Sequence, residues 1–330
     1  MTVPTGTDGI IQSVCVLTQP EGFYLWVTNL DGMGFVTYDV NRYTPRQMVV
    51  LPAILLIISL IVLGYSMATT GMPVKPGMDF SGGTAITIYT EDSPDVLKTV
   101  LSEYPIIYPI ESGINNGKFL KFGLMDEATF DSLTSILDER YPDAWQLAQI
   151  DATFGQTLQQ LAIYALIFSF LGMTIVVFLA FRSFVPAGAV ILSAFANIVM
   201  TAAVMVIVGI ELTLPTFAAL LMLIGYSVDS DILLTMRVLK RQGKLEEKLG
   251  GAFRTGIIMT TTTLAAVAAM GIVAYLGNVP VIPAIASVLF IGLIFDMMNT
   301  WLTNAGIIKW YVQKQESRQR KESGKKRGVK

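Results

Sequence analysis

Six long apolar segments constrain this chain more than any other feature of its sequence. They cover residues 48–67, 161–181, 184–208, 212–236, 256–276 and 282–308. Each is long enough, at about 1.5 Å per residue, to cross the roughly 30 Å of hydrocarbon in a bilayer. A composition of 53% hydrophobic and 15% charged residues also favours lipid as the solvent. The sequence therefore predicts a membrane protein with six transmembrane helices.

Basic residues are concentrated in alternate connections between these segments. Eighteen of the 23 lysines and arginines lie before the first segment, between the second and third, between the fourth and fifth, or after the sixth. Because loops rich in lysine and arginine stay in the cytoplasm, we expect a multi-pass protein of the cytoplasmic (cell) membrane with both termini inside. The basic connection 237–254 and an unstructured basic tail, 309–330, are expected to contact lipid headgroups. We expect no nucleic-acid partner.

Residues 70–157 lie on the opposite side and are polar enough to form a domain of their own. Strand patterns occur at 83–90, 106–110, 118–124 and 145–153, and helical patterns at 93–104 and 126–140. The order βαββαβ is typical of a ferredoxin-like fold, which supports many functions. The predicted fold class is an all-α membrane bundle of six helices with an extracytoplasmic ferredoxin-like α+β domain between helices 1 and 2. The expected divisions are 1–47, 48–69, 70–157, 158–308 and 309–330.

Ionisable groups inside the spans are few. The chain has no histidine and one cysteine, so the usual zinc sites and a disulfide within the chain are excluded, and we expect no cofactor or metal. Asp229, Asp231 and Asp296 are the carboxylates within the spans, and each costs about 2.5–3.5 kcal/mol near a helix centre. We therefore predict that they form a polar site, in ion passage or in contact with a partner.

The directions in which these carboxylates point follow from helix geometry. Two residues that are two positions apart on a helix point about 200° apart, so Asp229 and Asp231 cannot face the same cavity. One is expected to face the core of this bundle, and the other a partner or a water-filled seam. Asp296 is the expected counterpart from the sixth span. Thr260, the first of four consecutive threonines in the fifth span, either bonds its own backbone or belongs to the site.

Two short motifs carry a resemblance to a known family. The first follows the first span and the second lies in the fourth; their members are Asp79, Phe80, Gly82 and Gly83, and Gly225, Tyr226 and Ser227. At these places in a chain with six spans, they resemble the signature segments of the SecD/SecF family of protein-export membrane proteins, in its SecF branch. That family belongs to the resistance-nodulation-division (RND) superfamily.

The resemblance implies an auxiliary subunit of the Sec protein translocation machinery. Such a subunit acts with a separate SecD-like subunit and the Sec translocation channel to promote export of polypeptides across the cytoplasmic membrane. The expected partners are therefore a SecD-like chain, the channel, the exported polypeptide and membrane lipid. The protein is not expected to be an enzyme.

The fourth span departs from the bacterial pattern of the family. Bacterial members read Gly-Tyr-Ser-x-Asn-Asp, with the final Asp linked to proton passage. Here that position is Ser230, flanked by Asp229 and Asp231, which is closer to the archaeal branch. Coupling to ion flow is therefore left open. The arginine of the bacterial fifth span has its nearest counterpart at Arg254 or Thr255.

Two other functions compete with export assistance. An RND-superfamily exporter of small molecules or lipids would need twelve helices and would form them as a homodimer. An intramembrane protease would need two carboxylates facing each other across helices. The chain lacks the Gly-x-Gly-Asp pattern of such proteases, and Asp229 and Asp231 point apart.

The first thirty residues do not fit the family pattern, and they contain neither a span nor a clear domain. Met33 is a plausible alternative start. Peptides from residues 2–26 in the cellular protein would reject that start.

Overall fold

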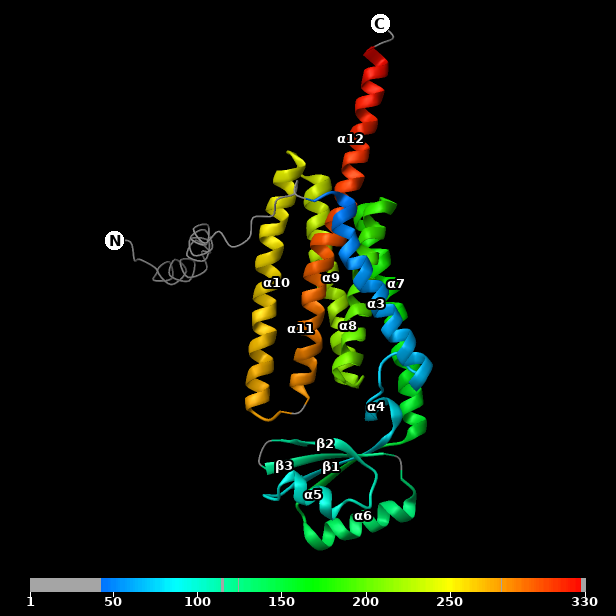
Figure 1. Cartoon of the computed structure of the whole chain (residues 1–330), viewed down its shortest axis with the longest axis vertical. Coiled ribbons are helices and arrows are strands. Elements are labelled where there is room, and N and C mark those ends of the chain that lie inside the picture. The colour runs from blue at the N-terminus through cyan, green and yellow to red at the C-terminus, as the bar shows by residue number, and fades with distance from the viewer. Residues whose placement is uncertain (1–42, 114–115, 124, 280, 328–330) are drawn as a thin grey trace, which may run out of the picture. The chain divides into compact units, whose positions relative to one another are not determined.

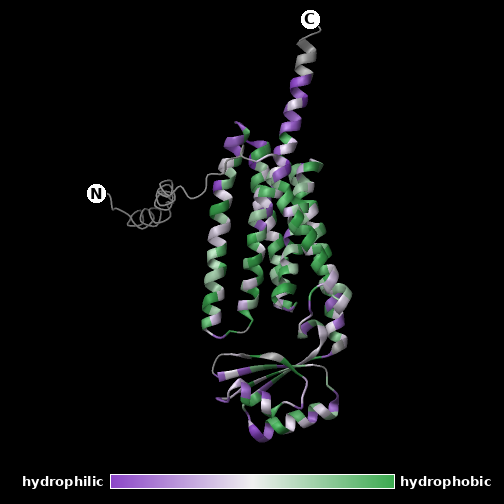
Figure 2. Cartoon of the chain, in the orientation of Figure 1, coloured by the Kyte–Doolittle hydropathy of each residue, from purple (hydrophilic) through white to green (hydrophobic). Residues whose placement is uncertain are grey.

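A computed structural model describes residues 43–113, 116–123, 125–279 and 281–327 (Figure 1). Met33 and the rest of the segment before residue 43 lie outside the described residues. Within them, six helices are long and apolar enough to cross a membrane, as the sequence predicts. They are α3 (Pro45–Thr70), α7 (Ala152–Phe181), α8 (Phe184–Val208), α9 (Leu214–Lys240), α10 (Leu245–Leu276) and a last helix in three parts, α11 (Ile282–Met298), the π-helix η3 (Asn299–Asn304) and α12 (Ala305–Arg327). Figure 2 shows these helices as largely hydrophobic along the bundle.

Three helices extend by more than four residues beyond the apolar segments. Helix α7 begins at Ala152 rather than at 161, and α10 begins at Leu245 rather than at 256. Helix α12 runs to Arg327, so the expectation of an unstructured tail from 309 is wrong for its described part. These extensions are rich in Lys, Arg, Glu and Gln, which have high helix propensity, and hydropathy alone does not detect them.

Helix α8 is the central helix of the bundle. Buried residues make up 67% of its apolar stretch, against 17% for α3, 11% for α7 and 17% for α10. Many of its buried residues are alanines, including Ala187, Ala194 and Ala203. Small residues let helix backbones approach closely, so α8 packs against α3, α7, α9, α11 and η3.

The segment between α3 and α7 forms a four-stranded sheet with two helices. Its elements are the short helix α4 (Met78–Ser81), then β1 (Gly83–Tyr89), α5 (Pro94–Val100), β2 (Ile106–Ser112), β3 (Gly117–Phe122), α6 (Glu127–Arg140) and β4 (Trp145–Ile150). The strand order is β2-β3-β1-β4, and every pair is antiparallel. Figure 1 shows α5 and α6 on one side of this sheet. From β1 onward, the elements follow the order predicted from the sequence.

A buried apolar core holds the sheet against α5 and α6. One face of the sheet packs against α5 and α6. It carries Ile86 and Ile88 of β1 and Leu120 of β3, which pack in one cluster with Leu97 and Leu133 of the helices; all five are fully buried. Ile86 pairs with Leu120 on one side and Leu147 on the other. The two-residue period of the strands therefore places their larger apolar side chains against the two helices.

Candidate functional site

A buried polar cluster lies inside the apolar bundle, between α8, α9, α11 and η3. Its side chains are at most 4% exposed. We call it the polar core, and its members are Ser193, Asn197, Ser227, Ser230, Asp231, Thr235, Asp296, Asn299, Thr300, Thr303 and Asn304. The core brings together Asp231, Asp296, Ser230 and Ser227 from the set that the sequence singled out.

The first level of the polar core is built around Asp296 of α11. Its Oδ1 accepts a hydrogen bond from Asn197 Nδ2 at 2.9 Å, and its Oδ2 accepts one from the Ser230 hydroxyl at 2.9 Å. Asn197 Nδ2 also donates to Ser227 Oγ at 2.7 Å, and its Oδ1 accepts from Asn299 Nδ2 at 2.5 Å. One asparagine of α8 therefore connects three other elements.

The second level is built around Asp231 of α9, which is fully buried. Its Oδ1 accepts from the Thr300 hydroxyl at 2.9 Å and from Asn304 Nδ2 at 2.8 Å. Among the described residues, no hydrogen bond to its Oδ2 meets the geometric limits, although the Ser193 side chain lies beside the carboxylate. Neither Asp231 nor Asp296 forms an ion pair with a lysine or arginine in the described part of the chain. The two aspartates come from facing helices, but they share no hydrogen bond.

The π-helix η3 supplies side chains to both levels. Such π-helical turns are rare, and many of those that do occur lie at functional sites. In η3, Asn299 and Thr303 bond to each other, while Thr300 and Asn304 both reach Asp231. Asn299 and Thr303 therefore face the first level, and Thr300 and Asn304 face the second.

The other predicted site residues lie outside the polar core. Asp229 is exposed on the surface of α9, on the side that also carries exposed Gly225 and Tyr226. Arg254 is exposed near the start of α10. Thr260 is buried on α10, whereas the next three threonines bond backbone carbonyls of their own helix. The expectation that Asp229 and Asp231 face different directions agrees with this geometry.

Asn197 and Ser193 of α8 were missed by the sequence analysis. The signal was present, because Asn197 is the one amide in the apolar run 184–208, and polar side chains in such runs commonly bond to other helices. Such uncharged polar residues stand out less in an apolar run than carboxylates do.

The glycine motif after α3 forms the joint between the sheet and the bundle. Gly82 and Gly83 adopt φ of 75° and 144°, in the region that favours glycine. A Cβ on Gly83 would lie 2.7 Å from Phe122 O of β3. The two glycines therefore allow α4 to turn directly into β1, where the sequence predicted no more than a turn.

Phe80 anchors this joint to the bundle. Its ring is 1% exposed and stacks edge-on against Phe217 of α9, with 6.3 Å between ring centroids. Its carbonyl accepts from Gln159 Nε2 of α7 at 2.7 Å. Asp151 caps α7 by accepting from Thr153 N at 2.6 Å, and this bond lowers the pKa of Asp151.

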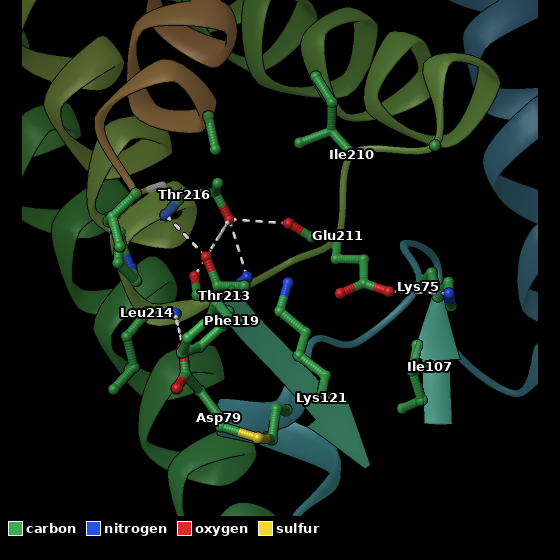
Figure 3. Close-up of a pocket in the computed structure, with 15 residues that line it drawn as sticks. Lys75, Asp79, Ile107, Phe119, Lys121, Ile210, Glu211, Thr213, Leu214 and Thr216 are labelled. Carbon is green, nitrogen blue, oxygen red and sulfur yellow. Dashed lines mark hydrogen bonds and ion pairs between the residues drawn. The ribbon is translucent and has the colours of Figure 1, made fainter. Parts of the chain in front are cut away.

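A pocket of about 670 Å³ opens beside the joint, between β2, β3 and the connection from α8 to α9 (Figure 3). Lys75 Nζ and Glu211 Oε1 form an ion pair at 2.8 Å on its wall. Asp79 Oδ2 accepts from Leu214 N at 2.8 Å, as the close-up shows. Asp79 thus satisfies an amide of the first turn of α9, an end where negative charge is favourable.

Replacing Asp79 with alanine is expected to lower the free energy of unfolding by about 1 kcal/mol, because the Leu214 amide loses its acceptor. Asp79→Asn keeps an acceptor oxygen and is expected to retain most of the stability. Denaturation of the purified chain measures both variants. Equal losses for alanine and asparagine would contradict the capping role.

The comparisons with known proteins agree in naming one family. Residues 133–314 match the family model for the protein-export membrane protein SecD/SecF, C-terminal. The chain is 58% identical over 282 residues to a protein-export membrane protein SecF of Methanolacinia petrolearia, covering 86% of this chain and 99% of the relative. It is 41% identical to a SecF of Haloferax volcanii, covering 83% of this chain and 94% of the relative.

A solved structure shares the fold. The chain matches the crystal structure of SecDF, a translocon-associated membrane protein from Thermus thermophilus, with a TM-score of 0.63 and 19% identity. The match covers 86% of this chain but only 41% of that longer one. Because family model, close relatives and fold agree, the chain belongs to the SecF family of protein-export membrane proteins, which is not a class of enzymes.

Proposed function

We propose that this chain is the SecF-type subunit of a complex with a separate SecD-like subunit, and that the complex assists the Sec translocation channel in exporting polypeptides. The observation that carries the proposal is the 58% identity to a SecF over 99% of its length. The chain spans 41% of the solved SecDF chain. A second, SecD-like chain would supply the remainder.

The surface position of Asp229 supports a protein partner. Asp229 lies just past the middle of α9, which has 27 residues, and its side chain is exposed. A carboxylate facing lipid at this depth would cost about 2.5–3.5 kcal/mol. A partner helix that donates a hydrogen bond to Asp229 removes this cost, so we assign the exposed side of α9 to the SecD-like subunit.

We also propose the topology that the basic residues predict. Both termini lie in the cytoplasm, and the sheet with α5 and α6 is a ferredoxin-like domain outside the membrane, within residues 70–157. Its element order and strand order are those of the split βαβ arrangement. The basic residues near the ends of α9 and α12 then contact lipid headgroups on the cytoplasmic side.

Purification from native membranes tests the partnership. A SecD-like chain at equal yield is the expected result, and Asp229→Leu is expected to reduce that yield. Asp131→Leu, at an exposed aspartate of α6 outside the helix bundle, is the matched control. Recovery of a homodimer alone would favour the small-molecule exporter and contradict the proposal.

Asp231 and Asp296 are proposed as the intramembrane groups that export requires. Asp296→Asn is expected to slow secretion of a reporter polypeptide about tenfold, because an amide has one acceptor oxygen where two hydrogen bonds are received. Asp231→Asn is expected to act similarly. Secretion rates are compared at equal abundance of the chain in membranes. Asp131→Asn, on the exposed surface of α6, is the control, and unchanged secretion in both core variants would reduce these aspartates to structural groups.

A further inference from the structure

A polar pocket and an apolar groove adjoin each other at the end of the bundle that is next to the sheet. The pocket is the one of about 670 Å³ beside the joint, whose wall carries two lysines and two carboxylates. The groove has a volume of about 580 Å³ and lies between α10 and α11. Within the described residues, no charged side chain lines the groove, and the Ser287 hydroxyl bonds the Pro283 carbonyl of its own helix. We call it the α10–α11 groove.

The pocket and the groove are continuous. Ile210, in the connection from α8 to α9, lines both of them. On the first turns of α11, Ala284 lines the pocket, whereas Pro283 and Ser287 line the groove. Together they match a ligand with one polar end and one apolar chain.

The α10–α11 groove has the length of one lipid leaflet. On α10 it extends from Val267 to Leu276, and on α11 from Pro283 to Ile291. At about 1.5 Å per residue, these stretches are about 12–14 Å long, and half of the roughly 30 Å hydrocarbon core is about 15 Å. The groove therefore spans the depth of the lipid chains in the leaflet next to the sheet.

The shape of the groove suits a hydrocarbon chain. Buried Val267 and Ala286 form its floor, and exposed Ile272 and Tyr275 form its rim. A Cβ on Gly271 would lie 3.0 Å from Ala286 Cβ, so α10 and α11 approach closely along this floor. A chain lying in the groove gains dispersion contacts on several sides without removing a polar group from water.

The pocket offers positive charge to a headgroup. Figure 3 shows Lys121 reaching from β3 into the pocket, toward the connection from α8 to α9. Lys75 Nζ donates to Glu211 at 2.8 Å, but the Lys75 side chain is 65% exposed and its ammonium carries three protons. Lysines near the membrane surface attract anionic headgroups, so the pocket favours a negatively charged lipid.

We propose that one phospholipid with an anionic headgroup binds here, with its phosphate beside Lys75 and Lys121 and one acyl chain in the α10–α11 groove. A partner helix fits less well, because Ile107 and Phe119 of the sheet cover the pocket at the mouth of the groove. A transmembrane helix would have to pass this cover, whereas a lipid ends beneath it. The bound lipid then links the sheet to the bundle beside the joint.

Native mass spectrometry of the purified full-length chain, with any subunits that accompany it, tests the site. Delipidated protein in detergent is titrated separately with dioleoyl phosphatidylglycerol, dioleoyl phosphatidylcholine and glycerol phosphate. We expect phosphatidylglycerol to bind at least about fivefold more tightly than phosphatidylcholine, because of the lysines. Glycerol phosphate has the charge without the chains, and we expect it not to bind over the same concentrations.

Ala268→Phe tests the groove, because it places a ring where the chain lies. We expect it to weaken the binding of both phospholipids about tenfold. Ala269→Phe is the matched control, since that neighbouring position is exposed and does not line the groove. It is expected to bind lipid as the unchanged chain does.

Lys121→Gln tests the pocket without altering the packing of the bundle. We expect it to weaken the binding of phosphatidylglycerol about fivefold and to leave that of phosphatidylcholine unchanged. Lys118→Gln is the control, because Lys118 lies three positions away on β3, faces the opposite side of the sheet and bonds Ser112.

Equal binding of the two phospholipids to the unchanged chain would overturn the lipid site. So would unchanged binding in Ala268→Phe. A photoreactive residue in place of Ile272 that cross-links to a SecD-like chain would show that a partner helix fills the groove, and would overturn it as well. The inference goes beyond the role in export and is separable from it, because lipid binding and recovery of a SecD-like chain are measured independently.

Discussion

Replacing Gly155 with valine is expected to lower the free energy of unfolding by about 3 kcal/mol, because α7 crosses α4 there without room for a side chain. A Cβ at Gly155 would lie 2.8 Å from Phe80 O and 3.0 Å from Gly82 N. Both are backbone atoms, so no side-chain rotation relieves the overlap. The crossing also carries the Gln159–Phe80 hydrogen bond, which the displacement would break.

Gly172 provides the matched control on the same helix. It is exposed, and a Cβ there would have no atom of the described residues within 4 Å. Gly172→Val is therefore expected to change stability by less than about 1 kcal/mol, in line with helix propensity alone. The free energies of unfolding of both variants are compared in the same detergent. Protease cleavage within residues 77–83 is a second measurement, and we expect it to increase only for Gly155→Val. Equal stability of the two variants would show that close packing of α7 at Gly155 against Phe80 and Gly82 does not contribute to stability.

The spans and the sheet were predictable because both depend on local sequence patterns. The run 184–208 is apolar apart from Ser193, Asn197 and Thr201, and α8 covers the same residues. The alternation in β1 predicts a strand, and its register with β3 follows from packing of the apolar face. Helix starts were less predictable, because α10 begins in a polar segment where Glu246 and Glu247 favour the first turn.

The candidate site was only partly predictable because its contacts join residues far apart in the sequence. A charged residue in an apolar run stands out, so Asp231 and Asp296 were found. The π-helix leaves no such signal, and the pairing of Asp296 with Asn197 depends on how α8 and α11 pack. Similarly, the glycine motif predicts a turn, but its contact with Gly155 is a property of the folded chain.

Replacing Asn197 with leucine is expected to lower the free energy of unfolding by about 3 kcal/mol. The change removes the donor to Asp296 and to Ser227 and the acceptor for Asn299. Within the part of the chain that the structure describes, Asn299 Nδ2 then retains only Met200 Sδ, at 3.7 Å. Each buried group left unpaired costs about 1–3 kcal/mol, and a buried carboxylate costs more than a neutral group.

The size of this loss shows whether the polar core acts as one network. Hydrogen bonds between transmembrane helices average only about 0.6 kcal/mol, because the unfolded chain in the membrane finds other partners. Thr262→Leu, at an exposed threonine of α10 that bonds its own backbone, controls for adding leucine. If Asn197→Leu loses no more than about 2 kcal/mol relative to that control, or about 0.6 kcal/mol for each of its three bonds, these bonds are ordinary helix contacts. A loss near 3 kcal/mol that is not additive with Asn299→Leu would mean that Asn197 holds Asp296 in place through a connected network.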